Sequence, residues 1–204
     1  MIKFLPNGEV DPSFYGREYF DPGPQGGLKS YCTLTSYKPA VERRRIDALF
    51  QVASPRCLLD VGCGKGYFLR ALLDVGGVEV FGCDVSRYAL SFLDKRLQDK
   101  VFCASVVDRP RFLKLFQGKG IDTIFSCDVL EHIRDVDGAL LSMLGLMPEV
   151  MVHQIAGLEE DEDLSHVTLR GEEFWREKLD TLGYSTELKE LGDFRFYVSR
   201  ASWL

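Results

Sequence analysis

The sequence lacks the features that mark secreted and membrane-spanning chains. None of its apolar runs approaches the roughly 18 uninterrupted residues that cross a bilayer. Near the N-terminus, Pro6 and Gly8 interrupt the chain before the apolar core of a signal peptide could form. We therefore expect a cytoplasmic protein without a membrane partner.

Positive charge is also scarce. The 204 residues carry 31 Asp and Glu against 25 Lys and Arg, so the formal net charge is −6. Binding to nucleic-acid phosphates needs a basic surface, and the basic run Arg43–Arg45 fits the solvent-exposed face of a helix. The composition therefore predicts that nucleic acid is not a partner.

The sequence also lacks the C-x-x-C motif, because no two of its six cysteines have that spacing. Four of them fall in or beside expected strands, where a reduced cysteine packs as a small apolar side chain. We expect reduced core cysteines and no metal site. The six are Cys32, Cys57, Cys63, Cys83, Cys103 and Cys127.

What the chain does contain is a glycine-rich turn within Leu58–Leu69, LLDVGCGKGYFL. An apolar run, three alternating glycines (Gly62, Gly64, Gly66) and a helix-like segment indicate a nucleotide-binding corner. Dinucleotide sites use G-x-G-x-x-G, whereas here the third glycine comes one residue early. Asp60, two residues before the first glycine, would oppose a diphosphate but suit a ligand that carries an ammonium and a sulfonium group.

A second carboxylate ends the next apolar strand, expected over 78–83. Asp84 lies about 20 residues after the glycine-rich turn, where a carboxylate accepts hydrogen bonds from ribose hydroxyls. The alternative is that Asp84 caps the following helix beside Ser86.

A third block, SCDVLEHI at Ser126–Ile133, follows the expected strand 121–127. Together with LLDVGCGKG, at the same separation, it resembles the small-molecule branch of the class I S-adenosylmethionine (SAM) dependent methyltransferases, of the bacterial type 11/12 kind. The stretch DLSHVTLR at 163–170, followed by Phe174 and Trp175, is similar to a segment of the same bacterial enzymes.

The resemblance covers residues 40–204 and, more loosely, 13–39. It implies an α/β, Rossmann-like, doubly wound and mostly parallel seven-stranded sheet. The implied strand order is 3-2-1-4-5-7-6, with strand 7 antiparallel and helices on both faces. Strand–helix alternation followed by a terminal hairpin agrees with this architecture.

The resemblance also implies that SAM is the cofactor, with S-adenosylhomocysteine as its product. The turn after the first strand would surround the methionine part, and the residues after the second strand would hold the ribose. Where relatives place an acid against adenine, this chain has Ser105 and Val106, so the adenine contact stays open. The cofactor-binding candidates are Asp60, Gly62, Cys63, Gly64, Gly66, Asp84, Val85, Ser105, Val106, Cys127 and Asp128.

Three histidines are the candidate catalytic groups: His132, His153 and His166. A histidine accepts a proton near neutral pH, but methyl transfer needs a general base only when the acceptor atom is protonated. The alternative is structural: His132, with Glu131, stabilises its loop, His153 is satisfied in the core, and His166 fixes a lid over the acceptor.

The chain divides into a segment at 1–38, rich in proline, glycine and aromatic residues, and a SAM-binding domain at 39–204. The first segment either covers the cleft or packs on the domain surface. Expected helices lie at 39–52, 66–75, 86–97, 112–116, 136–146 and 171–182, and expected hairpin strands at 185–190 and 194–203.

The sequence thus predicts an enzyme that transfers a methyl group to an O, N or C atom of a small molecule, mainly by alignment. One alternative is a non-catalytic SAM-binding subunit or sensor, and another is a nicotinamide-dependent oxidoreductase. The acceptor, the general base and the oligomeric state stay open.

Overall fold

The strands coincide with the apolar runs of the sequence. The computed structural model describes residues 2–21, 37–158, 163–180 and 183–202. The strands are β1 (Cys57–Val61), β2 (Glu79–Asp84), β3 (Val101–Cys103), β4 (Thr123–Cys127), β5 (Val150–Gln154), β6 (Tyr184–Leu191) and β7 (Phe194–Ala201).

These seven strands form one sheet in the order β3-β2-β1-β4-β5-β7-β6. β1 to β5 pair in parallel, and β7 is antiparallel to both β5 and β6. Leu59 of β1 lies opposite Phe81 of β2 and Ile124 of β4, so the apolar runs are in register. The predicted fold class and strand order are confirmed.

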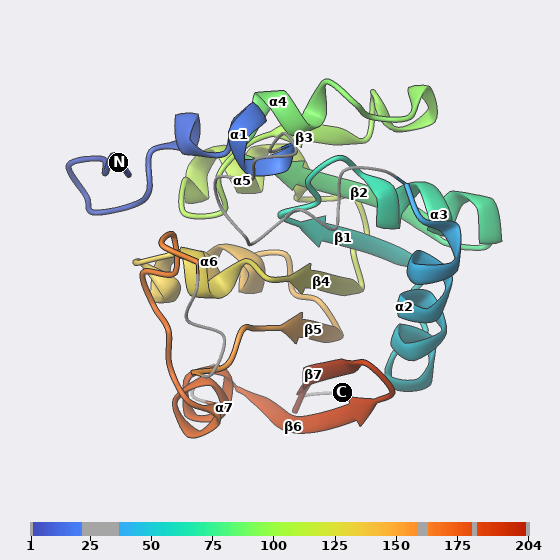
Figure 1. Cartoon of the computed structure of the whole chain (residues 1–204). Helices are drawn as coiled ribbons and strands as arrows, with labels where there is room; N and C mark the ends of the chain where they lie inside the picture. The colour runs from blue at the N-terminus through green and yellow to red at the C-terminus, as the bar shows by residue number, and fades with distance from the viewer. Residues whose placement is uncertain (1, 22–36, 159–162, 181–182, 203–204) are drawn as a thin grey trace.

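Helices cover both faces of the sheet (Figure 1). Alternate residues of β1 serve different cores, because successive side chains of a strand point to opposite faces: Leu58 packs in the core with α2 and α3, and Leu59 in the core with α5, α6 and α7. The helices are α1 (Arg17–Phe20), α2 (Pro39–Val52), α3 (Tyr67–Val75), α4 (Arg87–Leu90), α5 (Arg109–Phe116), α6 (Val136–Leu144) and α7 (Glu172–Asp180), with 3-10 turns η1 (Pro12–Phe14), η2 (Lys95–Leu97) and η3 (Leu130–His132).

The helix expected over 86–97 is interrupted. Ser86 caps α4 as predicted, because its hydroxyl accepts from the Ala89 N–H at 3.0 Å, but α4 ends at Leu90. Asp94 then accepts from the Arg96 N–H at 3.0 Å and begins a separate turn, η2. Leu97 is nevertheless fully buried, so the apolar spacing predicted burial correctly and the helix wrongly.

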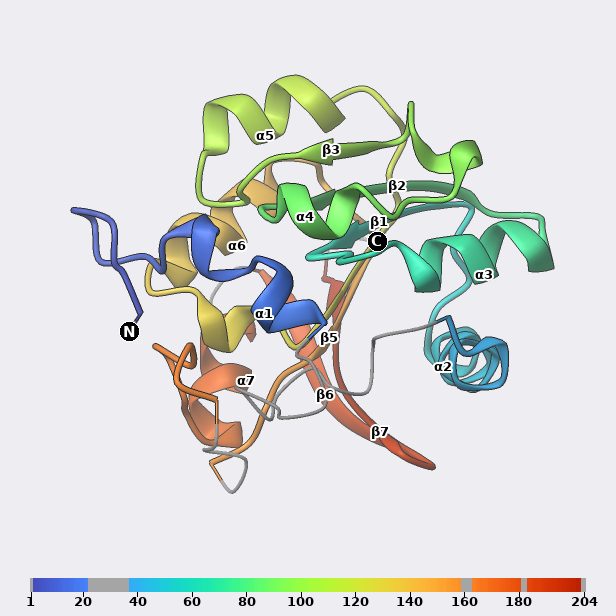
Figure 2. The ribbon, with the colours of Figure 1, turned by 45° about the horizontal axis from the view of Figure 1, so that its top comes forward.

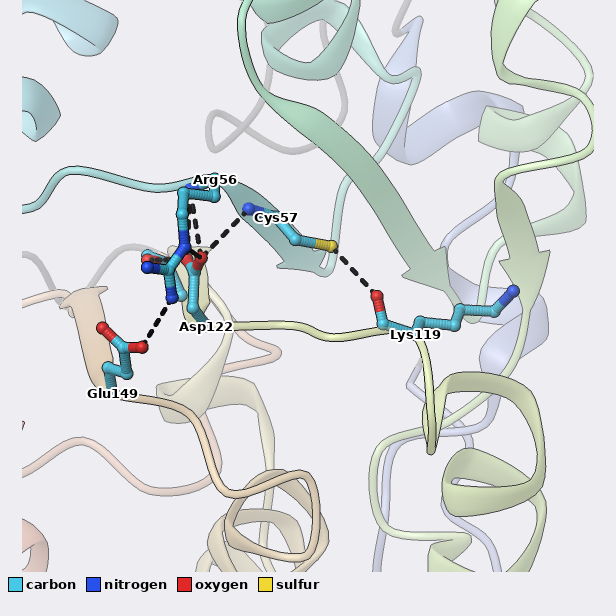
Figure 3. A network of polar contacts seen from close by, with 6 residues as sticks. Arg56, Cys57, Lys119, Asp122 and Glu149 are labelled. Carbon is cyan, nitrogen blue, oxygen red and sulfur yellow. Dashed lines mark hydrogen bonds and ion pairs between the residues drawn. The ribbon is translucent and has the colours of Figure 1, made fainter.

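A polar network joins the starts of several parallel strands, at the amino-terminal edge of the sheet (Figure 3). The Asp122 carboxylate accepts from the backbone N–H groups of Arg56 and Cys57 at 3.1 and 3.3 Å, which ties the start of β4 to that of β1. The Arg56 guanidinium also donates to Glu149, before β5, at 2.7 Å. The network therefore joins the residues that immediately precede three neighbouring strands, β1, β4 and β5.

Residues 2–21 run across the carboxyl ends of the strands, beside α4 (Figure 2). Tyr19 and Phe20 are buried there in a small apolar cluster with Ala89. Residues 1 and 22–36 of the segment predicted at 1–38 lie outside the described residues, and so do residues 159–162. Among the helices of the described residues, none combines the length and the apolar character that a membrane span requires.

Candidate cofactor and active site

A cavity of about 450 Å³ lies at the carboxyl ends of the central strands. Ligands of open parallel sheets bind at this edge, where the strand order reverses, and pockets of roughly 300–1,000 Å³ are typical of small-ligand sites. The loops after β1, β2, β3 and β4 contribute to its wall, together with residues of the N-terminal segment. All the sequence positions chosen for cofactor binding except Gly66 therefore line one cavity.

The glycine-rich turn after β1 forms one wall. Its backbone adopts positive φ at Gly62 (77°) and Gly64 (54°), a conformation that favours glycine. A Cβ on Gly62 would come within 2.3 Å of Val129. A Cβ on Gly64 would point toward Phe20 at 3.5 Å, so the missing side chain leaves room for a ligand against the backbone.

Gly66 has a different function. It does not line the cavity. It precedes the first residue of α3 with φ 71°, and a Cβ there would come within 2.6 Å of Leu93. Close packing of the turn against the segment after α4 explains this glycine.

Asp84 lines the cavity at the end of β2. Its two carboxylate oxygens accept from the N–H groups of Gly64 at 2.8 Å and Ser86 at 2.7 Å. Burial raises the pKa of Asp84, and the backbone N–H groups of Ser86 and Gly64 oppose that shift. Each carboxylate oxygen keeps a second lone pair for a ligand hydroxyl, so the ribose-binding and structural interpretations of Asp84 are compatible.

Asp60 lies at the same edge and is 4% exposed. Burial raises its pKa well above the ordinary value, and the nearby Arg45 guanidinium acts in the opposite direction. Arg45 lies on α2, lines the cavity, and pairs with Glu42 at 2.8 Å. The sequence interpretation placed Arg45 on a solvent-exposed helix face, because the basic run Arg43–Arg45 gave no sign that its last member turns inward.

Acidic side chains outnumber basic ones around the cavity. Arg45 and Lys65 are its basic lining residues among those described. Lys65 is also bound to Asp21 at 2.5 Å, so part of its charge is already compensated. A cationic ligand is therefore favoured over a diphosphate. The acidic lining residues are Glu9, Glu42, Asp60, Asp84, Asp108 and Asp128.

The loops after β3 and β4 complete the wall. Ser105 and Val106 line the cavity, and the Ser105 hydroxyl accepts from the Val107 N–H at 3.3 Å. Cys127 and Asp128 line it at the tip of β4, where Asp128 has φ 55°. A non-glycine residue held in this conformation is uncommon and concentrates at functional sites.

The three candidate histidines occupy different environments. His132 lines the cavity, and its Nδ1 contacts the Ser165 hydroxyl at 2.9 Å. The His166 ring packs edge-on against His132, with 4.7 Å between ring centroids, one layer behind the cavity wall. His153 is fully buried in β5 against Ser126 at 2.8 Å and does not reach the cavity.

The N-terminal segment provides the outer wall. Tyr15, Tyr19 and Phe20 line the cavity, and the Ser86 hydroxyl donates to the carbonyl of Tyr15. Asp21 accepts from Tyr88 at 2.7 Å. Three aromatic side chains of this segment therefore contact the cavity, and its assignment as a cover stays a prediction.

The family comparison agrees with this geometry. Residues 59–148 match the family model described as a methyltransferase domain. A curated relative, the tRNA U34 carboxymethyltransferase of Idiomarina loihiensis, is 35% identical over 86 residues. That match covers 40% of this chain and 26% of the relative, so the chain spans about a quarter of the relative's length.

Solved structures show the same fold. The complex between the Haloferax volcanii Trm112 methyltransferase activator and its methyltransferase matches with a TM-score of 0.64 and 17% identity, over 80% of this chain and 95% of that chain. A SAM-dependent methyltransferase from Archaeoglobus fulgidus gives a TM-score of 0.62 and 21% identity, over 88% of this chain and 77% of that chain.

Fold, family match and glycine-rich corner together define a class I SAM-dependent methyltransferase domain. The resemblance recognised in the sequence is confirmed, and SAM is the cofactor of this class. The functions of the individual site residues stay predictions.

The prediction about partners is wrong. Nucleic acid was excluded on net charge and a small-molecule acceptor was expected, yet a relative carries the name of a tRNA-modifying enzyme, and the Haloferax volcanii structure is a complex with a protein activator. A net charge of −6 is a sum over the whole chain, and it says nothing about the surface on which an acceptor or a protein would dock.

Proposed function

We propose that this chain transfers a methyl group from SAM to an acceptor that enters the cavity near His132 and Asp128. The observation that supports it is the convergence of the two buried carboxylates, Asp60 and Asp84, with the open glycine turn on one mainly acidic cavity. Bound SAM supplies a methyl group already activated by its sulfonium. The chain must then bind the acceptor, orient it toward the methyl group and exclude water.

Each wall has a part in this proposal. Asp84 accepts hydrogen bonds from the ribose hydroxyls, Asp60 attracts the ammonium group, and the backbone at Gly64 lies against the methionine part. Tyr15, Tyr19 and Phe20 cover the site and exclude water. Alignment of two reactants in such a site can supply roughly 7–11 kcal/mol of the barrier.

The acceptor would approach from the side of the β4 loop. His132 is the one candidate histidine on the cavity wall among the described residues, so it is the general base if the acceptor atom carries a proton. The accepting atom can be O, N or C. Because the relative from Idiomarina loihiensis is named for a tRNA substrate, tRNA is the acceptor class to test first.

Calorimetry with SAM and S-adenosylhomocysteine tests the binding step. Asp84→Ala removes hydrogen bonds to a charged acceptor, each worth about 1.5–3 kcal/mol, so SAM should bind at least tenfold more weakly. The matched control is Asp193→Ala, whose side chain is 76% exposed in the β6–β7 turn. Unchanged affinity in Asp84→Ala would show that the cofactor lies elsewhere.

Release of S-adenosylhomocysteine tests the catalytic step, with total tRNA and with small hydroxyl, amine and carbon acceptors. Turnover with any of them excludes the alternative of a non-catalytic SAM-binding subunit. A folded protein that binds neither SAM nor its product would contradict the proposal.

A further inference from the structure

Behind the β4 side of the cavity, three potential metal ligands meet: Glu131, His132 and His166. One ligand atom from each lies within 4.8 Å of the other two. Glu131 and His132 belong to η3, and His166 belongs to the loop that follows β5. Glu131 is fully buried and His132 is 9% exposed, so this is an interior cluster.

The surroundings of His132 determine which ring nitrogen is available. Nδ1 lies 2.9 Å from the hydroxyl of Ser165 and 3.3 Å from its carbonyl oxygen. The carbonyl can only accept, and the hydroxyl already donates to Asp163 at 2.6 Å. Nδ1 therefore carries the proton, and the lone pair is on Nε2.

Two ring nitrogens are left without a hydrogen-bond partner within the described ranges. They are Nε2 of His132 and Nδ1 of His166, and both atoms are buried. A buried nitrogen without a partner is costly, so a native structure normally supplies a hydrogen bond or a metal ion. The hydroxyl–carboxylate chain behind His132 is the kind of outer support that metal-binding histidines have.

The backbone holds the two ligand-bearing segments together. The Glu131 carbonyl accepts from the N–H groups of Val167 and Thr168, each at 2.9 Å. The Glu131 carboxylate also accepts from the Ala156 N–H at 2.8 Å. The loop that carries His166 is thereby fixed against η3, which limits the movement needed to surround an ion.

We propose that Glu131, His132 and His166 bind one divalent transition-metal ion, with Zn²⁺ as the best match. Two imidazoles and one carboxylate form a ligand set typical of Zn²⁺, with bonds of about 2.0–2.2 Å. In a tetrahedral site the ligand atoms of one such ion lie about 3.4 Å apart, so side-chain rotations must bring the three atoms closer together to complete the site. Because the ion would occupy the Nε2 lone pair, His132 would not act as the general base in the metal-bound chain.

The test uses the full chain, stripped with a chelator, without SAM. Titration with Co²⁺ should produce tetrahedral ligand-field absorption that saturates at one ion per chain, and calorimetry with Zn²⁺ should give the same stoichiometry. A folded wild-type chain that binds neither ion at one equivalent would overturn the proposal. Since no methyl transfer is involved, this result is independent of the proposed function.

Variants locate the ion. His166→Asn should abolish the Co²⁺ spectrum, and Ser165→Ala, which keeps all three ligands, should weaken binding about 10–100-fold. His153→Asn is the matched control, because it removes the one histidine outside the cluster and should leave the spectrum unchanged. Circular dichroism without metal checks the fold of each variant. Full-strength binding by a folded His166→Asn would contradict this ligand set.

Discussion

Asp60 shows what the site requires of a single residue. Asp60 is 4% exposed, and burial raises the pKa of its carboxyl well above the ordinary value. When the pKa of a carboxyl group is higher in the folded than in the unfolded chain, the group lowers the free energy of unfolding at every pH above its pKa in the unfolded chain. The chain therefore keeps a destabilising carboxylate at a position where a cationic ligand would offset it.

Replacing this carboxyl by its neutral isostere should separate stability from binding. Asp60→Asn should raise the melting temperature at about pH 7.5, where the wild-type carboxyl opposes folding, and the gain should shrink as the pH falls toward the unfolded value of about 3.9. The same variant should bind SAM at least about tenfold more weakly, because a charge-assisted contact is lost. Scanning fluorimetry across pH and calorimetry measure both effects.

The control is Asp193→Asn, which removes a largely exposed carboxylate and should change neither quantity. A lower melting temperature for Asp60→Asn at neutral pH would mean that Arg45 stabilises the carboxylate by more than burial destabilises it.

At the scale of elements, the N-terminal segment is fixed by a contact far away in sequence. The Glu9 carboxylate is 7% exposed and accepts from the N–H groups of Arg134 and Asp135, at 3.1 and 2.7 Å. These N–H groups immediately precede α6. One carboxylate therefore joins the cover of the cavity to the loop that carries His132.

Glu9→Ala should loosen that cover. Two N–H groups lose their acceptor, and a hydrogen bond to a charged group contributes about 1.5–3 kcal/mol. Limited proteolysis should cut the first 20 residues faster, and SAM should dissociate more quickly. Glu18→Ala, at an exposed site on α1, is the matched control. Equal proteolysis of the two variants would show that Glu9 does not hold the segment.

Local patterns predicted most elements and the open wall of the cavity. Continuous apolar runs identified the parallel strands, and alternation identified the terminal hairpin. Pro39 and Asp135 marked helix starts, and the spacing of glycine and acidic residues identified Asp60 and Asp84. The break after α4 escaped prediction because one capping residue, Asp94, outweighs helical apolar spacing.

Contacts between distant segments could not be predicted in the same way. Glu131 and His132 meet His166 only after β5 and its loop return to η3. Metal sites are recognised in sequence by ligands at fixed short spacing, and the cysteines lacked that spacing. The expectation of no metal site was argued from the cysteines alone, and the metal site proposed above involves residues that this argument did not consider.

The molecule as a whole should lose stability in acid through His153, which is fully buried. Burial lowers the pKa of His153 from 6.5 to about 4. A depressed folded pKa gives stability that is complete above the unfolded pKa and is lost as the pH falls through the folded pKa. The window is thus about pH 6.5 to 4, with a loss of roughly 3 kcal/mol.

Urea unfolding at several pH values measures this loss. The free energy of unfolding should depend less steeply on pH in His153→Gln than in the wild-type chain between about pH 6.5 and 4. The comparison concerns the slope, so a lower stability of the variant at neutral pH does not affect it. Equal slopes would mean that His153 takes up no proton on unfolding.

The borders of the sheet have a consequence for association between molecules. One border is β3, with only three residues, and the other is β6, which carries Glu187, Lys189 and Glu190 among its eight residues. Short or charged outer strands resist pairing with a neighbouring chain. Because the terminal hairpin places β7 against β5, the longer parallel strands β1, β2, β4 and β5 are all interior, and concentrated solutions are protected from strand-to-strand aggregation.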